Sequence, residues 1–155
     1  MNIFVVDEDP IVAAQQLCDK HVVKMVLETA QMLCTVARQN GFEKAPYKMA
    51  HPKHPCTIWA GKSAKNWEWL LAHGMALCEE YSRRYGKIHK SEAVIRWCSC
   101  LPLTFPEREL TPFAQAMPAQ YKNECVVTAY RAYYQNEKAS FATWKTEVPQ
   151  WWTAA

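Results

Sequence analysis

Glycine is scarce in this 155-residue sequence, which has four glycines but seven tryptophans and seven tyrosines. This balance favours a helical protein with many aromatic side chains for its core. No run of about 18 apolar residues occurs, so we expect no transmembrane helix and no membrane partner. The N-terminus also lacks the basic segment and long apolar stretch of a secretory signal, so we expect a cytoplasmic protein.

Cysteine is present in an odd number, seven, and most of the cysteines fall within apolar segments with a helical pattern. We expect them to be reduced and structural, as in intracellular proteins. A net charge of +3 allows nucleic-acid binding but does not argue strongly for it. A chain of this length can bury enough apolar surface to fold without a metal or a disulfide.

Local signals predict where the first helix begins and ends. In Asp9-Pro10, the aspartate can cap a helix and the proline suits the first helical position. We expect one helix from there to about Gln39, because Asn40-Gly41 is a typical helix stop.

The helical spacing of apolar residues predicts a second long helix, from about Thr57 or Ser63 to Arg84. Gly86 follows it and can adopt the left-handed conformation that ends many helices. A shorter helix is predicted over about residues 89–98.

The rest of the chain is predicted to be irregular apart from one more helix. Residues 101–118 contain four prolines and should wrap the surface, whereas residues 119–137 should be helical. We predict an all-α, single-domain compact bundle (1–155) of three or four main helices with long proline-containing loops. Residues 1–9 would be an N-terminal arm, and residues 138–155 an aromatic C-terminal tail.

The first long helix carries the most informative polar residues. His21 and Glu28 are about two helical turns apart, so they share one face, and Lys24 lies between them. A carboxylate in such a place can act as a general base, and a neighbouring lysine can form a Schiff base. Alternatively, Lys24 and Glu28 form an ordinary ion pair on an exposed face.

A second polar group has the spacing of metal ligands: His51, His54 and Cys56, which Cys98 and Cys100 could complete. The signal is weak, because no Cys-x-x-Cys motif is present and prolines separate the members. Ordered packing over a helix start, or an anion site, is the alternative. We therefore predict no metal and no cofactor.

Two surfaces carry the cations and aromatic groups that nucleic-acid binding uses. The densest basic cluster follows the second long helix, where it could contact phosphates or simply be a solvated helix end. The tryptophans of the tail could stack on bases or instead close the core. The candidate nucleic-acid-binding residues are Lys20, Arg83, Arg84, Lys87, His89, Lys90, Trp144, Trp151 and Trp152.

The pattern formed by Leu17, Asp19, His21 and Glu28 resembles the start of the phage pyrimidine-dimer DNA glycosylases/abasic-site lyases, which are small all-α proteins. In that family the matching helix carries a histidine and a catalytic glutamate at this separation. The resemblance implies that Glu28 stabilises a cationic sugar and assists proton transfer, while His21 positions the site or contacts the DNA backbone. An amine would attack C1′ and displace the base, and the resulting Schiff base would undergo β-elimination.

The source of the amine differs from the family pattern. The family uses the α-amine exposed when the initiator methionine is removed from before a small residue. Here Met1 precedes Asn2, a poor context for removal, and the arm before the helix is about five residues longer. The nucleophile could therefore be the amine of Met1 or a lysine such as Lys24, or the scaffold could lack lyase chemistry. Lys20 and Lys24 replace the arginines with which the family's first helix grips DNA.

The resemblance implies a monomeric DNA-processing enzyme that removes damaged or modified pyrimidines, located in the host cytoplasm if a phage encodes it. Two other functions stay open. One is a non-catalytic helical module that binds nucleic acid or protein through the same surface. The other is a metal-dependent enzyme built on His51, His54 and Cys56 with Glu28.

Overall fold

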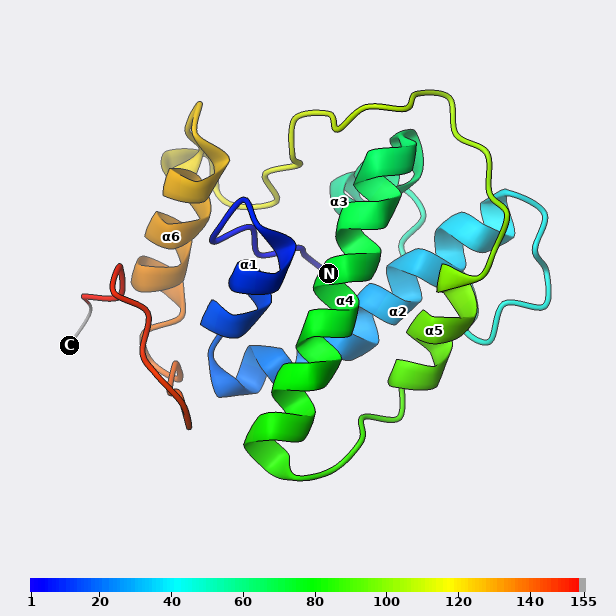
Figure 1. Ribbon diagram of the computed structural model, residues 1–155. Helices are drawn as coiled ribbons and strands as arrows, with labels where there is room; N and C mark the ends of the chain where they lie inside the picture. Colours follow the sequence, from blue (N-terminus) through cyan, green and yellow to red (C-terminus); the bar gives the residue numbers. More distant parts are fainter. Residues whose placement is uncertain (154–155) are drawn as a thin grey trace.

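The computed structural model describes residues 1–153 as six α-helices and one turn of 3-10 helix, with no β-strand in that range (Figure 1). The prediction of an all-α bundle is confirmed. The last two residues of the predicted tail, 154–155, lie outside the described part of the chain. The elements are α1 (Pro10–Gln16), α2 (Asp19–Gln39), α3 (Pro55–Lys62), α4 (Ala64–Tyr85), α5 (Glu92–Ser99), η1 (Ala119–Tyr121) and α6 (Val126–Glu137).

Helices α2 and α4 form the centre of the bundle, and α1, α3 and α5 pack against them. Figure 1 shows α4 crossing in front of α2, with α6 beside α1 and the segment after α5 passing over the top of the molecule. The two central helices approach closely at Gly74, where a Cβ atom would lie 2.8 Å from Cγ2 of Thr29. A Cβ atom at this crossing would force Thr29 or the helices to shift, so glycine is favoured here.

Several predicted helix ends are confirmed. The Asp9 carboxylate accepts hydrogen bonds from the backbone N–H groups of Ile11 and Val12, and Pro10 occupies the first position of α1. Helix α2 ends at Gln39, and Gly86 closes α4 with a left-handed φ of +67°. These ends depend on local backbone chemistry, which explains why sequence alone identifies them.

The prediction of one continuous helix from residue 10 to residue 39 is wrong. Leu17 and Cys18 have extended backbones, and they separate α1 from α2. Distant groups replace the helical hydrogen bonds here: the N–H of Cys18 donates to the Tyr134 hydroxyl (3.1 Å), and the N–H of Asp19 donates to the Thr143 carbonyl (2.8 Å). The break is thus a tertiary effect with no signal in the local sequence.

The second long helix begins after Ser63, one of its two predicted starts, and the other two predicted helices are shorter than expected. Helix α3 starts at Pro55, and extended Ser63 separates it from α4, whose first turn the Ser63 hydroxyl caps by accepting from the N–H of Asn66. The predicted helix over 89–98 begins only at Glu92. The predicted helix over 119–137 is reduced to η1 and α6, with residues 122–125 non-helical between them.

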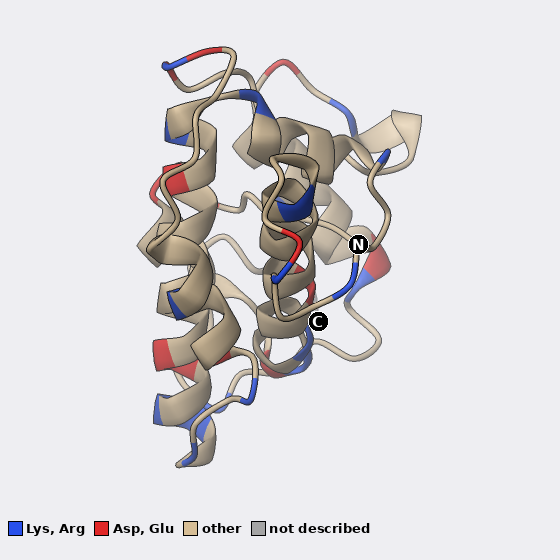
Figure 2. Cartoon of the chain, turned by 90° about the vertical axis from the view of Figure 1, so that its right-hand side faces the viewer, with Lys and Arg blue, Asp and Glu red and all other residues tan. Residues whose placement is uncertain are grey.

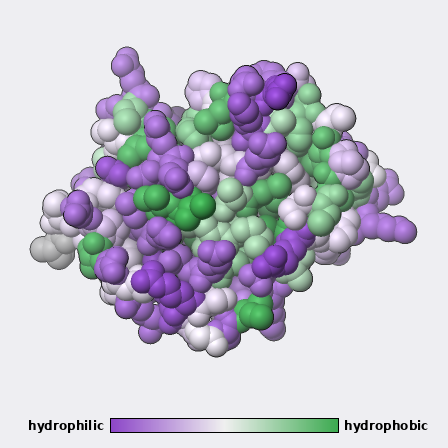
Figure 3. Space-filling view, viewed as in Figure 1, coloured by the Kyte–Doolittle hydropathy of each residue, from purple (hydrophilic) through white to green (hydrophobic). Residues whose placement is uncertain are grey.

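The surface is mixed in character. In Figure 3, hydrophobic side chains gather near the centre of the face on which α4 lies in front, and hydrophilic side chains surround them. Among the described residues, no helix is both long enough and apolar enough to cross a bilayer.

Candidate active site

The N-terminal arm runs through the interior of the protein. Residues 2–6 are all buried, and the Arg131 side chain donates a hydrogen bond to the Val6 carbonyl (2.8 Å). This path brings the α-amino group of Met1 to within 3.0 Å of Oε1 of Glu28, in the middle of α2. The arm thus delivers an amine to the carboxylate that the sequence pattern singled out.

Glu28 is enclosed, because its side chain is 10% exposed. Its second oxygen, Oε2, lies 3.6 Å from Nζ of Lys24, whose side chain is 62% exposed. The predicted ion pair between Lys24 and Glu28 therefore exists, but its carboxylate does not lie on an open face. A buried carboxylate that contacts two amines can hold a proton or stabilise a nearby cation.

A small cavity of about 120 Å³ opens beside this pair. Its walls come from three parts of the chain that are far apart in sequence: the arm, α2, and the end of α6. The lining residues are Met1, Asn2, Phe4, His21, Lys24, Met25, Glu28, Tyr133 and Lys138. The cavity therefore gathers all four predicted catalytic residues: Met1, His21, Lys24 and Glu28.

His21 is buried and held by aromatic groups. Its ring stacks on Phe4 at a centroid distance of 4.5 Å, and Nδ1 lies 2.7 Å from the Tyr134 hydroxyl. Burial, and then the positive charges of Lys138, Lys24 and Lys20, lower its pKa to about 3. The imidazole is therefore neutral at neutral pH, and it fixes the arm by packing against Phe4.

Lys138 also lines the cavity, although it is not among the predicted catalytic residues. It follows α6, and its ammonium lies 4.8 Å from the ring centre of Tyr133 and 5.9 Å from that of Phe4. Lys138 thus adds a second cationic side chain, with Lys24, to the lining of the cavity. No spacing rule could have found it, because only the tertiary fold brings the end of α6 to α2.

Asn2 is the other residue that the sequence did not suggest. It is 8% exposed, and its side-chain amide makes hydrogen bonds to three segments beyond the arm. An asparagine in an arm gives no sequence signal for such a role.

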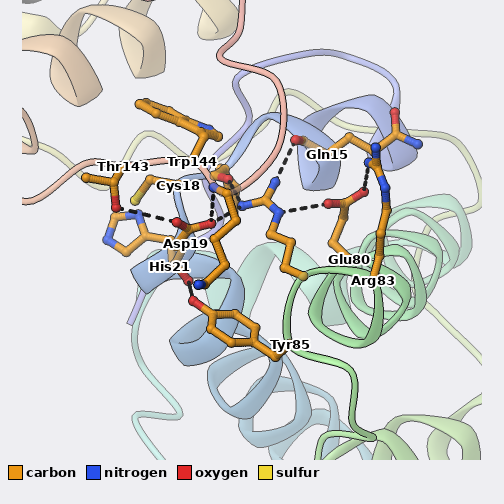
Figure 4. Close-up of polar contacts among 12 residues, drawn as sticks. Gln15, Cys18, Asp19, His21, Glu80, Arg83, Tyr85, Thr143 and Trp144 are labelled. Carbon is orange, nitrogen blue, oxygen red and sulfur yellow. Dashed lines mark hydrogen bonds and ion pairs between the residues drawn. The ribbon is translucent and has the colours of Figure 1, made fainter.

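The structure excludes Arg84 from a DNA-binding surface, because its side chain is 0% exposed. Its guanidinium pairs with Glu80 (2.9 Å) and Asp19 (3.2 Å) and also donates to the carbonyls of Leu17 and Gln15. Asp19 and Glu80 point into this network from α2 and α4 (Figure 4). The prediction for Arg84 is corrected: it joins α1, α2 and α4 instead of meeting phosphates.

The other predicted cations remain accessible. Lys20, Arg83, Lys87 and Lys90 are exposed, while His89 is half-buried, with Nε2 3.0 Å from the Val23 carbonyl. In the view of Figure 2, basic and acidic residues are interspersed along the chain instead of forming one basic face. The accessible cations are thus distributed around the molecule.

The three tail tryptophans are half-buried and pack against the core. Trp144 and Trp151 donate their indole N–H groups to the backbone carbonyl and the side-chain oxygen of Gln16, at 3.0 and 2.9 Å. Trp152 lies edge-on to both of its neighbours. These contacts match the alternative in which the tryptophans close the core.

The possible metal ligands serve other contacts. Nδ1 of His54 accepts from the N–H of Cys56, and the Cys56 thiol lies 3.6 Å from Oδ1 of Asn2. Cys98 lies beside Cys34, with their sulfur atoms 3.9 Å apart. Within the described residues, no three His, Cys, Asp or Glu side chains are arranged to hold a metal ion.

An all-α fold that places a carboxylate between two amines beside a cavity has the components of an amine-based enzyme. Comparison with known families identifies the class of enzyme: the family model for pyrimidine dimer DNA glycosylase matches residues 1–93. The chain belongs to this family, and the resemblance seen in α2 is confirmed. Family membership implies DNA glycosylase activity and a place in DNA repair. No curated protein and no solved structure matches the chain.

Proposed function

We propose that the protein is a base-excision DNA glycosylase and abasic-site lyase that acts on damaged or modified pyrimidines. The observation that carries the proposal is the 3.0 Å contact between the α-amino group of Met1 and Glu28, at the wall of the cavity. Family membership supports the glycosylase step, and the contact of the amine with a largely buried carboxylate supports the lyase step.

In this mechanism the unprotonated amine of Met1 attacks C1′ of the damaged nucleotide. The C1′–N bond breaks, and the base leaves with the bonding electrons and takes up a proton. Opening of the sugar ring gives a protonated Schiff base between C1′ and the amine. Loss of a proton from C2′ then expels the 3′ phosphate and breaks the strand, and water releases the amine by hydrolysis.

Glu28 is suited to two parts of this sequence. Its carboxylate can take the proton that the ammonium must lose before attack, since Oε1 is already 3.0 Å from the nitrogen. The same negative charge stabilises the cationic sugar as the base departs. A buried carboxylate is more effective at this than an exposed one, because solvent screens it less.

The remaining cations would bind the DNA backbone. Lys24 and Lys138 line the cavity and would contact the phosphates next to the reacting sugar, while Lys20, Arg83, Lys87 and Lys90 would contact phosphates farther away. Lys24 is also the alternative nucleophile, because its ammonium is the second amine beside Glu28. His89 would lie among these cations, and His21 would act by holding Phe4 and the arm.

The test uses a DNA duplex with a single abasic site, so that it does not depend on the identity of the damaged base. Incubation with borohydride reduces any Schiff base to a stable covalent adduct. We expect an adduct with the wild type and a rate about 1000-fold lower for Glu28→Gln. Glu68→Gln, at an exposed glutamate of α4, is the matched control and should react at the wild-type rate.

The absence of an adduct from folded, DNA-binding wild-type protein would overturn the lyase proposal. The non-catalytic helical module that binds nucleic acid would then be the better description. In ultraviolet-irradiated duplex the cleaved base stays joined to its neighbour through the dimer, so free pyrimidine measured after photoreversal of the dimers tests the glycosylase step.

A further inference from the structure

The side chain of Asn2 joins the N-terminal arm to three other parts of the protein. Its Nδ2 donates to the carbonyl of Ala116 (2.9 Å), in the proline-containing segment before η1. Its Oδ1 lies 2.9 Å from the hydroxyl of Tyr130, in α6, and 3.6 Å from the thiol of Cys56, in α3. The N–H of Ile3 also donates to Oδ1, at 2.8 Å.

The chemistry of these partners keeps the amide in one orientation. Burial raises the pKa of the Cys56 thiol to about 11 and also raises that of the Tyr130 hydroxyl, so both groups keep their protons at neutral pH. The Tyr130 hydroxyl can also accept, as it does from the N–H of Ala116, but the N–H of Ile3 can only donate and the Ala116 carbonyl can only accept. Turning the amide over would place Nδ2 against the N–H of Ile3 and Oδ1 against the carbonyl of Ala116.

This fixed residue is directly bonded to Met1. Because a residue has only two soft backbone torsions, an immobile Asn2 leaves the amine of Met1 little freedom to move away from Glu28. The amine itself has one carboxylate contact in the structure, at 3.0 Å, so the position of the arm determines whether that contact forms.

We propose that Asn2 is a positioning residue for the α-amine of Met1, and that the segment around Ala116 and the helix α6 control the direction of the nucleophile through it. The inference rests on the proposed function. It assigns part of the reaction's geometry to residues beyond position 93, the end of the family match.

The main test is Asn2→Leu, which keeps a side chain of similar shape but removes the amide. Leucine, like asparagine, is too large at the second position for efficient removal of the initiator methionine, and intact mass verifies that Met1 is retained. At saturating protein we expect the single-turnover rate of adduct formation on abasic DNA to fall about 100-fold, with unchanged DNA affinity. Peptide mapping should show part of the remaining adduct on Lys24 instead of Met1.

A second variant covers the case in which Asn2→Leu does not fold. Tyr130→Phe removes one donor to Asn2 from a helix that is distant in sequence, and we expect a rate reduction of about fivefold. The matched control is Asn66→Leu. Asn66 is a fully buried asparagine whose amide binds Thr111, in the same proline-containing segment, without contacting the arm.

Asn66→Leu should lose stability but keep the adduct rate per folded molecule and its attachment to Met1. Equal rates and equal attachment in wild type, Asn2→Leu and Tyr130→Phe would overturn the positioning role. Loss of rate in Asn66→Leu equal to that in Asn2→Leu would also overturn it, since the effect would then be general destabilisation. If the wild type itself forms no adduct, the proposed function fails first, which distinguishes the two failures.

Discussion

Helix α2 carries two charged clusters that differ in what surrounds them. At its start, Asp19 pairs with Arg84, which also pairs with Glu80, and the Arg84 side chain has no exposed surface. In its middle, Glu28 contacts the amine of Met1 and the ammonium of Lys24 at the wall of a cavity.

The difference separates a structural network from a candidate reactive one. Around Arg84, the bonds go to carboxylates and carbonyls of the protein itself, so the network joins helices and offers nothing to a ligand. Around Glu28, the exposed Lys24 and the amine of Met1 line a cavity that another molecule can enter. Burial of charge alone does not identify an active site, whereas burial beside a cavity with an available nucleophile favours one.

The largest expected effect comes from Glu28→Gln, which removes the charge of the cluster beside the cavity. We expect about a 1000-fold loss of adduct formation with less than about 1 kcal/mol change in the free energy of unfolding. Chemical denaturation and single-turnover trapping on the same preparation measure both. A severe loss of stability would instead mean that Glu28 is a structural residue, as Glu80 is.

Arg84→Met should give the opposite pattern. Its removal leaves Glu80 and Asp19 buried without their partner, so we expect the free energy of unfolding to fall by about 3 kcal/mol or more. The adduct rate per folded molecule should be unchanged. Arg83→Met, at a neighbour whose side chain is 58% exposed, serves as the control and should change stability by less than about 0.5 kcal/mol. A reaction defect in folded Arg84→Met would remove the distinction between the clusters.

Two buried histidines allow a test by pH, one beside the cavity and one distant from it. Desolvation by burial is the main cause that lowers the pKa of His21 to about 3 and of His73 to about 4, from 6.5. Both are neutral when folded, whereas the unfolded chain binds protons below pH 6.5, so stability should fall as pH falls from about 6.5 toward 4. Each histidine contributes up to about 1.4 kcal/mol per pH unit to this slope.

Denaturation at several pH values measures the slope, and His21→Gln and His73→Gln should each reduce it. The histidine at the candidate site is thus expected to respond to pH as the distant one does. If His21→Gln leaves the pH dependence of the unfolding free energy unchanged, His21 is not held neutral in the folded protein.

The smallest expected effect concerns the cations beside Glu28. Lys24→Gln and Lys138→Gln should each weaken DNA binding a few-fold and reduce the salt dependence of the affinity by about one counterion. Lys65→Gln is the control, because Lys65 pairs with Glu109 on another part of the surface. Fluorescence anisotropy over a salt series measures this. An equal effect in Lys65→Gln would mean that binding does not depend on the cavity.

The sequence predicts those parts of the fold that local chemistry determines. Asp9-Pro10 and Gly86 mark helix ends correctly, because capping and left-handed glycine act within one helical turn. The break at Leu17 and Cys18 could not be predicted, since Tyr134 and Thr143 provide the hydrogen bonds that replace those of a helix.

The candidate site likewise has one part that the sequence predicts and another that depends on tertiary contacts. Helical periodicity places His21, Lys24 and Glu28 on one face of α2, and the structure brings them to one cavity. Lys138 and the contacts of Asn2 depend on α6 and on the segment near Ala116, which the fold brings to the arm from far along the chain. Arg84 looked like a surface cation because the sequence does not show that Asp19 and Glu80 surround it.

The most direct test of the account is the atom to which reduced abasic DNA is attached. Trapping with borohydride, followed by proteolysis and mass spectrometry, distinguishes the N-terminal peptide from the one that contains Lys24. The structure predicts attachment to the α-amine of Met1, which Glu28 contacts at 3.0 Å. Attachment to Lys24 alone, with Met1 retained and unmodified, would contradict the central claim that the arm delivers the nucleophile.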